Sequence, residues 1–131
     1  MLYKNELNEK KRKVVLVIDD EKGILEEMQA WLGDHGYHVV TATNGADGLQ
    51  KLNEVTPNLI VLDVIMPQMD GFEVLLRLKN DLKTSSIPVI MLTAREDTSS
   101  ILKALEMKVA DYVIKPFNTE ELLKSIRIFE R

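Results

Sequence analysis

Five polar or charged side chains of this sequence stand at the ends of apolar runs. Asp19 and Asp20 follow the first run, Asp63 the third, Thr93 the fourth and Lys115 the fifth. Carboxylates bind hard divalent cations, and a carboxylate can also attack a phosphorus atom as a nucleophile. The five residues therefore form a candidate site for phosphoryl chemistry, provided that the fold brings them together.

Short apolar runs alternate with amphipathic segments along the chain. The runs are residues 13–18, 37–42, 59–62, 87–92 and 110–114. This alternation predicts one α/β domain, with a parallel sheet covered by helices on both faces. The carboxyl ends of parallel strands share one edge of the sheet, where open α/β folds keep their sites. We therefore expect the candidate residues to meet at that edge.

Two of the predicted helices carry several leucines at helical spacing. The helix that begins near Gly71 carries Leu75, Leu76 and Leu82 together with Phe72, and the next helix carries Leu102 and Leu105 together with Ile101. Such spacing is typical of the apolar face of an amphipathic helix. We expect these leucines to face the sheet.

The composition limits the class of protein. The 131 residues are 45% hydrophobic and 29% charged, with a net charge of -4 and no Cys. This balance disfavours direct binding to nucleic acid or to an anionic membrane, and it excludes disulfides and thiolate metal sites. No apolar run approaches the roughly 20 residues of a membrane span, and no signal peptide opens the chain. We expect a cytoplasmic protein with a flexible leader at residues 1–12 and a domain at residues 13–131.

The charges of the candidate site predict a metal ion. Two carboxylates about 4 Å apart repel each other by roughly 4 kcal/mol at an effective dielectric constant of 20. Lys115 offsets only one of the three carboxylates, so a hard cation such as Mg²⁺ is the expected partner. A phosphoryl group could then be held by the metal, Lys115 and Thr93 while Asp63 attacks it.

The motifs that carry these residues resemble the receiver domain of two-component response regulators. They are Asp19-Asp20, Asp63 with Met-Pro-Gln-Met-Asp-Gly at 66–71, Thr93-Ala94, and Tyr-Val-Ile-Lys-Pro-Phe at 112–117. The resemblance covers residues 13–131 and is to chemotaxis-type receivers in particular. It implies a doubly wound, flavodoxin-like sheet of five parallel strands in the order 2-1-3-4-5.

The resemblance also implies a signalling role and a set of ligands. Asp63 would take a phosphoryl group from a sensor histidine kinase or a histidine phosphotransfer protein. The chain would not be an enzyme beyond its own phosphorylation and dephosphorylation. Mg²⁺, or Mn²⁺ in its place, would be held by Asp20, Asp63 and the carbonyl oxygen of Ile65, with Asp19 acting through water.

The remaining implied roles concern the switch. Lys115 would pair with the phosphoryl group, and Thr93 would bond to it after transfer. Tyr112 would then turn inward and change the face formed by the fourth helix, fifth strand and fifth helix. The Lys115–Pro116 peptide bond would be cis.

The chain departs from the family pattern at three places, and the simplest departure is Ala110 in place of a frequent Asp. Lys108 and Val109 replace the usual Gly-Ala before the fifth strand, where Gly tolerates a positive φ better than Lys. Ser125 stands where receivers joined to winged-helix domains carry Arg. The rest of the charged dimer face of that group has counterparts here, which leaves a phosphorylation-dependent homodimer as one expectation. The counterparts are Arg95, Glu106, Asp111, Glu121 and Arg127.

Two residues flank the path by which water would reach a phosphorylated Asp63. Ile65 and Arg95 lie two positions after Asp63 and Thr93, respectively. The apolar side chain of Ile65 and the long side chain of Arg95 are expected to slow hydrolysis of the acyl phosphate.

Three other functions fit parts of the pattern. A phosphatase of the haloacid dehalogenase type also uses a strand-end Asp and Mg²⁺, but its Asp-x-Asp motif is absent from Asp19-Asp20-Glu21. A flavodoxin-like electron carrier would need a phosphate loop there, and acids would repel its phosphate. A binding-only adaptor would not need the complete set of acids with Thr93 and Lys115.

Overall fold

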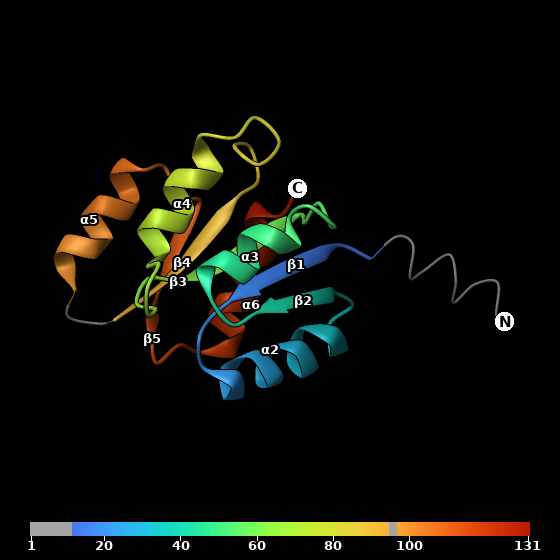
Figure 1. The fold of residues 1–131 in the computed structure, drawn as a ribbon. Helices are drawn as coiled ribbons and strands as arrows, with labels where there is room; N and C mark the ends of the chain where they lie inside the picture. The colour runs from blue at the N-terminus through green and yellow to red at the C-terminus, as the bar shows by residue number, and fades with distance from the viewer. Residues whose placement is uncertain (1–11, 95–96) are drawn as a thin grey trace, which may run out of the picture.

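The computed structural model describes residues 12–94 and 97–131 (Figure 1). The leader predicted at residues 1–12 lies outside this part except for Arg12, and so does Arg95. The strands are β1 (Val14–Ile18), β2 (His38–Ala42), β3 (Leu59–Asp63), β4 (Val89–Ala94) and β5 (Asp111–Lys115). The helices are α2 (Lys22–Asp34), α3 (Gly45–Lys51), α4 (Gly71–Lys79), α5 (Thr98–Glu106) and α6 (Thr119–Phe129). None of the helices in the two described ranges has both the length and the apolar character that a bilayer crossing requires.

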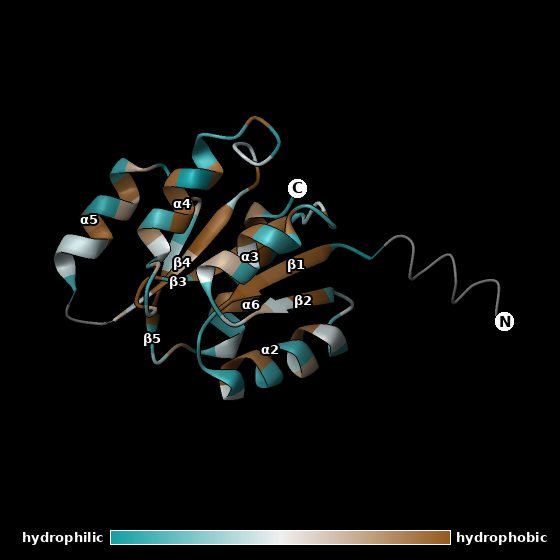
Figure 2. Ribbon diagram, viewed as in Figure 1, coloured by the Kyte–Doolittle hydropathy of each residue, from teal (hydrophilic) through white to brown (hydrophobic). Residues whose placement is uncertain are grey.

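The five strands are parallel and lie in the order β2-β1-β3-β4-β5, as predicted. Successive residues of β1 point to opposite faces of this sheet. Val15 and Val17 pack with α2 and α6, whereas Leu16 and Ile18 pack with α3, α4 and α5. Figure 2 shows β1 as hydrophobic along its length, which is typical of a strand buried on both faces.

Four leucines predicted to face the sheet do not. Leu76 is 52% exposed on the outer side of α4, and Leu82 is 95% exposed in the loop after that helix. On α5, Leu102 and Leu105 are 58% and 52% exposed, and the small Ala104 occupies the buried position. The prediction was wrong for Leu82 because α4 already ends at Lys79. It was wrong for the other three because the exposed side of a helix also tolerates single apolar residues, which spacing alone does not distinguish from core residues.

The turn before β5 keeps a left-handed conformation in spite of its sequence. Lys108 has a φ of 59°, at the place where the family usually has Gly. A left-handed conformation costs a residue with a Cβ atom roughly 1–2 kcal/mol. Gly avoids this cost, but it loses more conformational entropy on folding, so the net gain in stability is smaller. We expect Lys108→Gly to raise the free energy of unfolding by about 0.5–1 kcal/mol in urea titrations.

The matched control for this variant is Lys83→Gly. It removes the same charge from an exposed loop residue, and no positive φ occurs at Lys83. Lys83→Gly is expected to leave stability unchanged or to lower it slightly. Equal effects of the two substitutions would contradict the role assigned to the backbone conformation of Lys108.

Candidate functional site

The strand ends bring four of the predicted residues to one edge of the sheet. Asp19 directly follows β1, Asp63 ends β3, Thr93 is the second-last residue of β4, and Lys115 ends β5. Lys115 is in register with Ala94, and Asp63 is in register with Leu92 of β4. Asp19, Asp63 and Thr93 are almost fully buried, at 0%, 4% and 2% exposure. The fold therefore positions these groups at the ends of adjacent strands.

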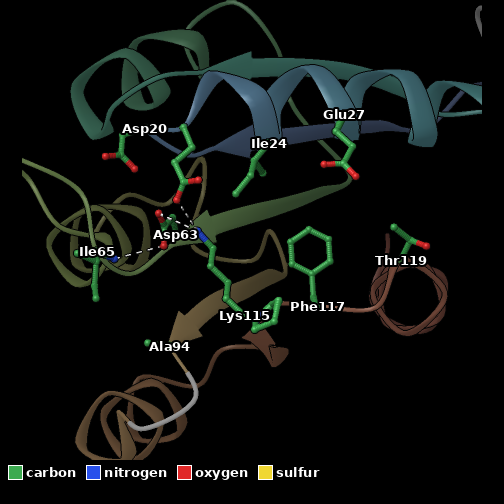
Figure 3. Close-up of a pocket in the computed structure, with 11 residues that line it drawn as sticks. Asp20, Ile24, Glu27, Asp63, Ile65, Ala94, Lys115, Phe117 and Thr119 are labelled. Carbon is green, nitrogen blue, oxygen red and sulfur yellow. Dashed lines mark hydrogen bonds and ion pairs between the residues drawn. The ribbon is translucent and has the colours of Figure 1, made fainter.

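Lys115 lies at the centre of an ion-pair cluster (Figure 3). Its Nζ atom is 3.1 Å from Oδ2 of Asp19, 3.3 Å from Oδ2 of Asp63 and 3.8 Å from Oε1 of Glu21. The predicted cis peptide bond between Lys115 and Pro116 is present. Three strands that are distant in sequence thus deliver oppositely charged groups to one point, as the sequence predicted.

The surroundings of Asp63 favour its neutral form. Burial and the nearby carboxylate of Asp19 raise the pKa of Asp63 to about 6, although the Lys115 ammonium and the Ile65 N–H act in the opposite direction. Burial opposes the charge of Lys115, but the carboxylates of Asp63 and Asp19 outweigh this effect and raise the pKa of Lys115. At neutral pH the site therefore holds a buried carboxylate whose charge is only partly compensated.

This arrangement predicts a pH-dependent cost to stability. Since the pKa of Asp63 is about 6 in the folded chain against 3.8 ordinarily, its contribution to stability is fully present below about pH 4 and is lost as the pH rises through 6. We expect Asp63→Asn to be more stable than the wild type at pH 7 by about 2–3 kcal/mol, with the difference shrinking towards pH 4. Urea titrations across this range would measure it. A difference that grew on acidification would contradict the assignment.

The acidic residues of the pocket suit a hard divalent cation. One carboxylate oxygen each from Asp19, Asp20 and Glu21 can be chosen so that all lie within 4.8 Å of one another. Asp20, Glu21, Asp63 and Ile65 all line the same pocket, and Oδ1 of Asp63 accepts a weak hydrogen bond from the Ile65 N–H at 3.4 Å. Mg²⁺ prefers oxygen ligands, and the carboxylates of this pocket carry more negative charge than the Lys115 ammonium offsets. The residues therefore fit the metal that the family resemblance implies.

The hydroxyl group of Thr93 also indicates a ligand. Its Oγ1 atom is buried and has no hydrogen-bond partner among the described residues. A buried hydroxyl without a partner costs free energy and calls for an explanation. A group bound next to Asp63, within reach of this hydroxyl, would supply one.

The pocket extends beyond the residues that the sequence singled out. Its volume is about 640 Å³, and its far wall comes from α2, from the segment between β5 and α6, and from the first residue of α6. That wall is formed by Ile24, Glu27, Phe117 and Thr119, as Figure 3 shows. Glu21 was also missed as a site residue, although its position directly after Asp20 was a usable signal. The contacts of the far wall depend on how α2 and α6 pack, which no local motif encodes.

Apart from Thr93 on β4 and Arg95, which lies outside the described residues, the predicted switch and dimer residues lie on β5, α5 and α6. Tyr112 is half-buried in β5. Ser125, which is buried, donates a hydrogen bond from Oγ to Oδ2 of Asp111 at 2.6 Å, and Oδ1 of Asp111 accepts the Tyr112 N–H at 2.9 Å. The carboxylate of Asp111 is thus engaged within its own chain, whereas Glu106, Glu121 and Arg127 are exposed.

Comparisons with known proteins point to one family. The sequence pattern of the response regulator receiver domain matches residues 15–127. A probable transcriptional regulator, ycf27, of Cyanophora paradoxa is 44% identical over 122 residues, which are 93% of this chain and 48% of that protein. The transcriptional regulatory protein AfsQ1 of Streptomyces coelicolor is 42% identical over 86% of this chain and 49% of its own length. The chain thus spans about half the length of these curated relatives.

Solved structures show the same relationship. The chemotaxis protein CheY4 of Vibrio cholerae superposes with a TM-score of 0.84 at 30% identity, covering 90% of this chain and 98% of that chain. A receiver domain from Methanoculleus marisnigri is 36% identical, with a TM-score of 0.72 over 88% of this chain and 94% of its own. The chain therefore belongs to the response regulator receiver domain family and is the receiver domain of a response regulator in a two-component system.

Proposed function

We propose that Asp63 accepts a phosphoryl group from a phosphorylated histidine and that this modification is the signal. The observation that carries the proposal is the position of Asp63, which is buried at the floor of an open pocket with the Lys115 ammonium 3.3 Å from its Oδ2 atom. The receiver unit would comprise residues 13–131, with residues 1–12 as its leader.

In the proposed reaction a carboxylate oxygen of Asp63 attacks the phosphorus atom. The bond between phosphorus and the donor nitrogen breaks, and its electron pair leaves with the imidazole of the donor. The product is an acyl phosphate on Asp63. Lys115 stabilises the charge on the phosphoryl oxygens. The Thr93 hydroxyl, which has no partner among the described residues, bonds to one of these oxygens after transfer.

Mg²⁺ would supply a second centre of positive charge for the phosphoryl oxygens. Asp20, Asp63 and the carbonyl oxygen of Ile65 would hold it, with Asp19 acting through water. Asp19 is suited to an indirect role because its Oδ1 accepts the Glu21 N–H at 2.9 Å and its Oδ2 pairs with Lys115. Mn²⁺ could replace Mg²⁺ in such an oxygen-rich site.

The partners follow from this chemistry. The donor would be a sensor histidine kinase or a histidine phosphotransfer protein, and Tyr112 would couple the state of Asp63 to the face formed by α5, β5 and α6. This face would serve as the output surface. It would also form the interface of a homodimer that assembles on phosphorylation. The hydroxyl of Ser125 already donates a hydrogen bond to the carboxylate of Asp111 within the chain. Asp111 would therefore contribute less to charge pairs across that dimer. Any DNA binding would belong to a further domain of a longer protein, as the names of the curated relatives suggest.

The proposal is tested by incubating the protein with acetyl phosphate and Mg²⁺ and measuring its intact mass. We expect a mass gain of one phosphoryl group that requires the metal and is lost on treatment with hydroxylamine, which cleaves acyl phosphates. No mass gain with either acetyl phosphate or a phosphorylated histidine donor would overturn the proposal in favour of a binding-only adaptor.

The lifetime of the acyl phosphate should depend on Ile65. Its side chain is 63% exposed and lines the pocket beside Asp63, where a polar residue could orient an attacking water molecule. We expect Ile65→Asn to shorten the half-life of the phosphorylated protein about tenfold, equivalent to about 1.4 kcal/mol in the barrier. Loss of the added mass after removal of the donor gives the rate.

Ile128→Asn is the matched control for this prediction. Ile128 is 62% exposed on α6 and is not among the residues that line the pocket. Its replacement should leave the half-life unchanged. Loss within seconds in the wild type, with the same rate in Ile65→Asn, would contradict the shielding role of Ile65.

A further inference from the structure

Glu21 occupies a position whose usual task it does not perform. It is the N-cap residue of α2, where a side-chain oxygen normally accepts a hydrogen bond from the first turn of the helix. The Glu21 side chain makes no such bond, and α2 has no acidic residue in its first turn. A local rule that is broken without a local gain often marks a functional constraint.

The Glu21 carboxylate instead turns towards the site. Its Oε1 atom lies 3.8 Å from Nζ of Lys115, and its side chain remains 62% exposed. One of its oxygens also lies within 4.8 Å of oxygens from both Asp19 and Asp20. Among the described carboxylates that pair with Lys115, Glu21 has the exposed side chain and thus the room to change partners, whereas Asp19 and Asp63 are buried at the ends of their strands.

We propose that Glu21 is a positioning residue that pairs with Lys115 in the metal-free protein and turns to the hydration shell of Mg²⁺ when the metal binds. This inference rests on the proposed function of Asp63. The move would strengthen metal binding by adding one negative charge near the ion. It would also release Lys115 from one of its three carboxylate partners, leaving the ammonium free to follow the phosphoryl group.

The charge of the pocket supports this exchange. Among the described residues at this strand edge, Asp19, Asp20, Glu21 and Asp63 give four carboxylates, and Lys115 gives the ammonium that pairs with three of them. A dication attracts a nearby carboxylate more strongly than an ammonium does at equal distance, since the interaction scales with charge. The high exposure of Glu21 lets its side chain change partners without disturbing the core.

The test compares Mg²⁺ binding to the wild type, Glu21→Gln, Glu21→Asp and Glu27→Gln by isothermal titration calorimetry. Glu27 lines the same pocket from α2 but does not belong to the acidic group around Asp20. A carboxylate about 5 Å from a dication, screened by solvent and salt, predicts Kd for Mg²⁺ about three- to tenfold weaker in Glu21→Gln. Glu21→Asp should retain most of the affinity, and Glu27→Gln should match the wild type.

A second measurement separates this role from a structural one. The rate of phosphorylation by acetyl phosphate, followed against Mg²⁺ concentration, should show a higher half-saturating Mg²⁺ concentration in Glu21→Gln. Equal Mg²⁺ affinity in Glu21→Gln and the wild type, in a wild type that takes up phosphate, would overturn the inference alone. A wild type that binds Mg²⁺ but takes up no phosphate would instead overturn the proposed function.

Discussion

Replacing Asp63 by Asn is expected to abolish phosphoryl uptake from acetyl phosphate in the presence of Mg²⁺. The amide has nearly the size of the carboxylate, but it lacks the anionic oxygen that attacks phosphorus. It also removes one charge from the proposed metal site. Since burial of the Asp63 charge is costly, the variant should remain folded, and the loss can then be assigned to chemistry. Intact mass after incubation would show an unmodified protein.

Asp81→Asn provides the matched control for this experiment. Asp81 is exposed in the loop after α4, and its Oδ1 accepts the Lys83 N–H, which an Asn oxygen can also do. This variant should take up phosphate like the wild type. Full uptake by Asp63→Asn would contradict the assignment of the acceptor, and retained hydrolysis of phosphoesters by that variant would favour the phosphatase alternative.

The sheet was predictable because its signal is local. Each strand is a short run of apolar residues, and runs such as 14–18 and 59–63 are buried on both faces. Parallel pairing then follows from the intervening helices. The order of the strands rested on the family resemblance. Helix faces were less predictable: Leu102 and Leu105 have core spacing on α5, yet the helix packs through Ala104.

The candidate site also combines features that the sequence predicts with features that it does not. Asp19, Asp63 and Lys115 could be identified because each ends an apolar run, and parallel pairing brings strand ends together. The position of Glu21 directly after Asp20 is visible in the sequence, but the role proposed for it could not be predicted, because that role depends on the direction of its side chain at the start of α2. The same holds for the bond from Ser125 to Asp111, which joins α6 to β5. Such contacts arise from packing between elements, and a single sequence does not record them.

Replacing Lys115 by Met is expected to be the most destabilising single change at the site. Met fills similar space, but it leaves Asp19, which is fully buried, and Asp63 without their shared ammonium. Removing one partner of a buried ion pair costs 3–5 kcal/mol. The 21% exposure of the Lys115 side chain places the expected loss at about 3 kcal/mol at pH 7. Lys124→Met, at an exposed position on α6, should change little.

The dependence on pH distinguishes charge from packing in this variant. Without Lys115 the pKa of Asp63 should rise further above its present value of about 6, because the ammonium is the largest influence that lowers it. Protonation of Asp63 then removes the uncompensated charge, so the loss in Lys115→Met should shrink between pH 7 and pH 5. Mg²⁺ at millimolar concentration should also restore part of the stability at pH 7, since it binds the folded site alone. A loss that is independent of both pH and Mg²⁺ would show that Lys115 acts through packing of its aliphatic chain.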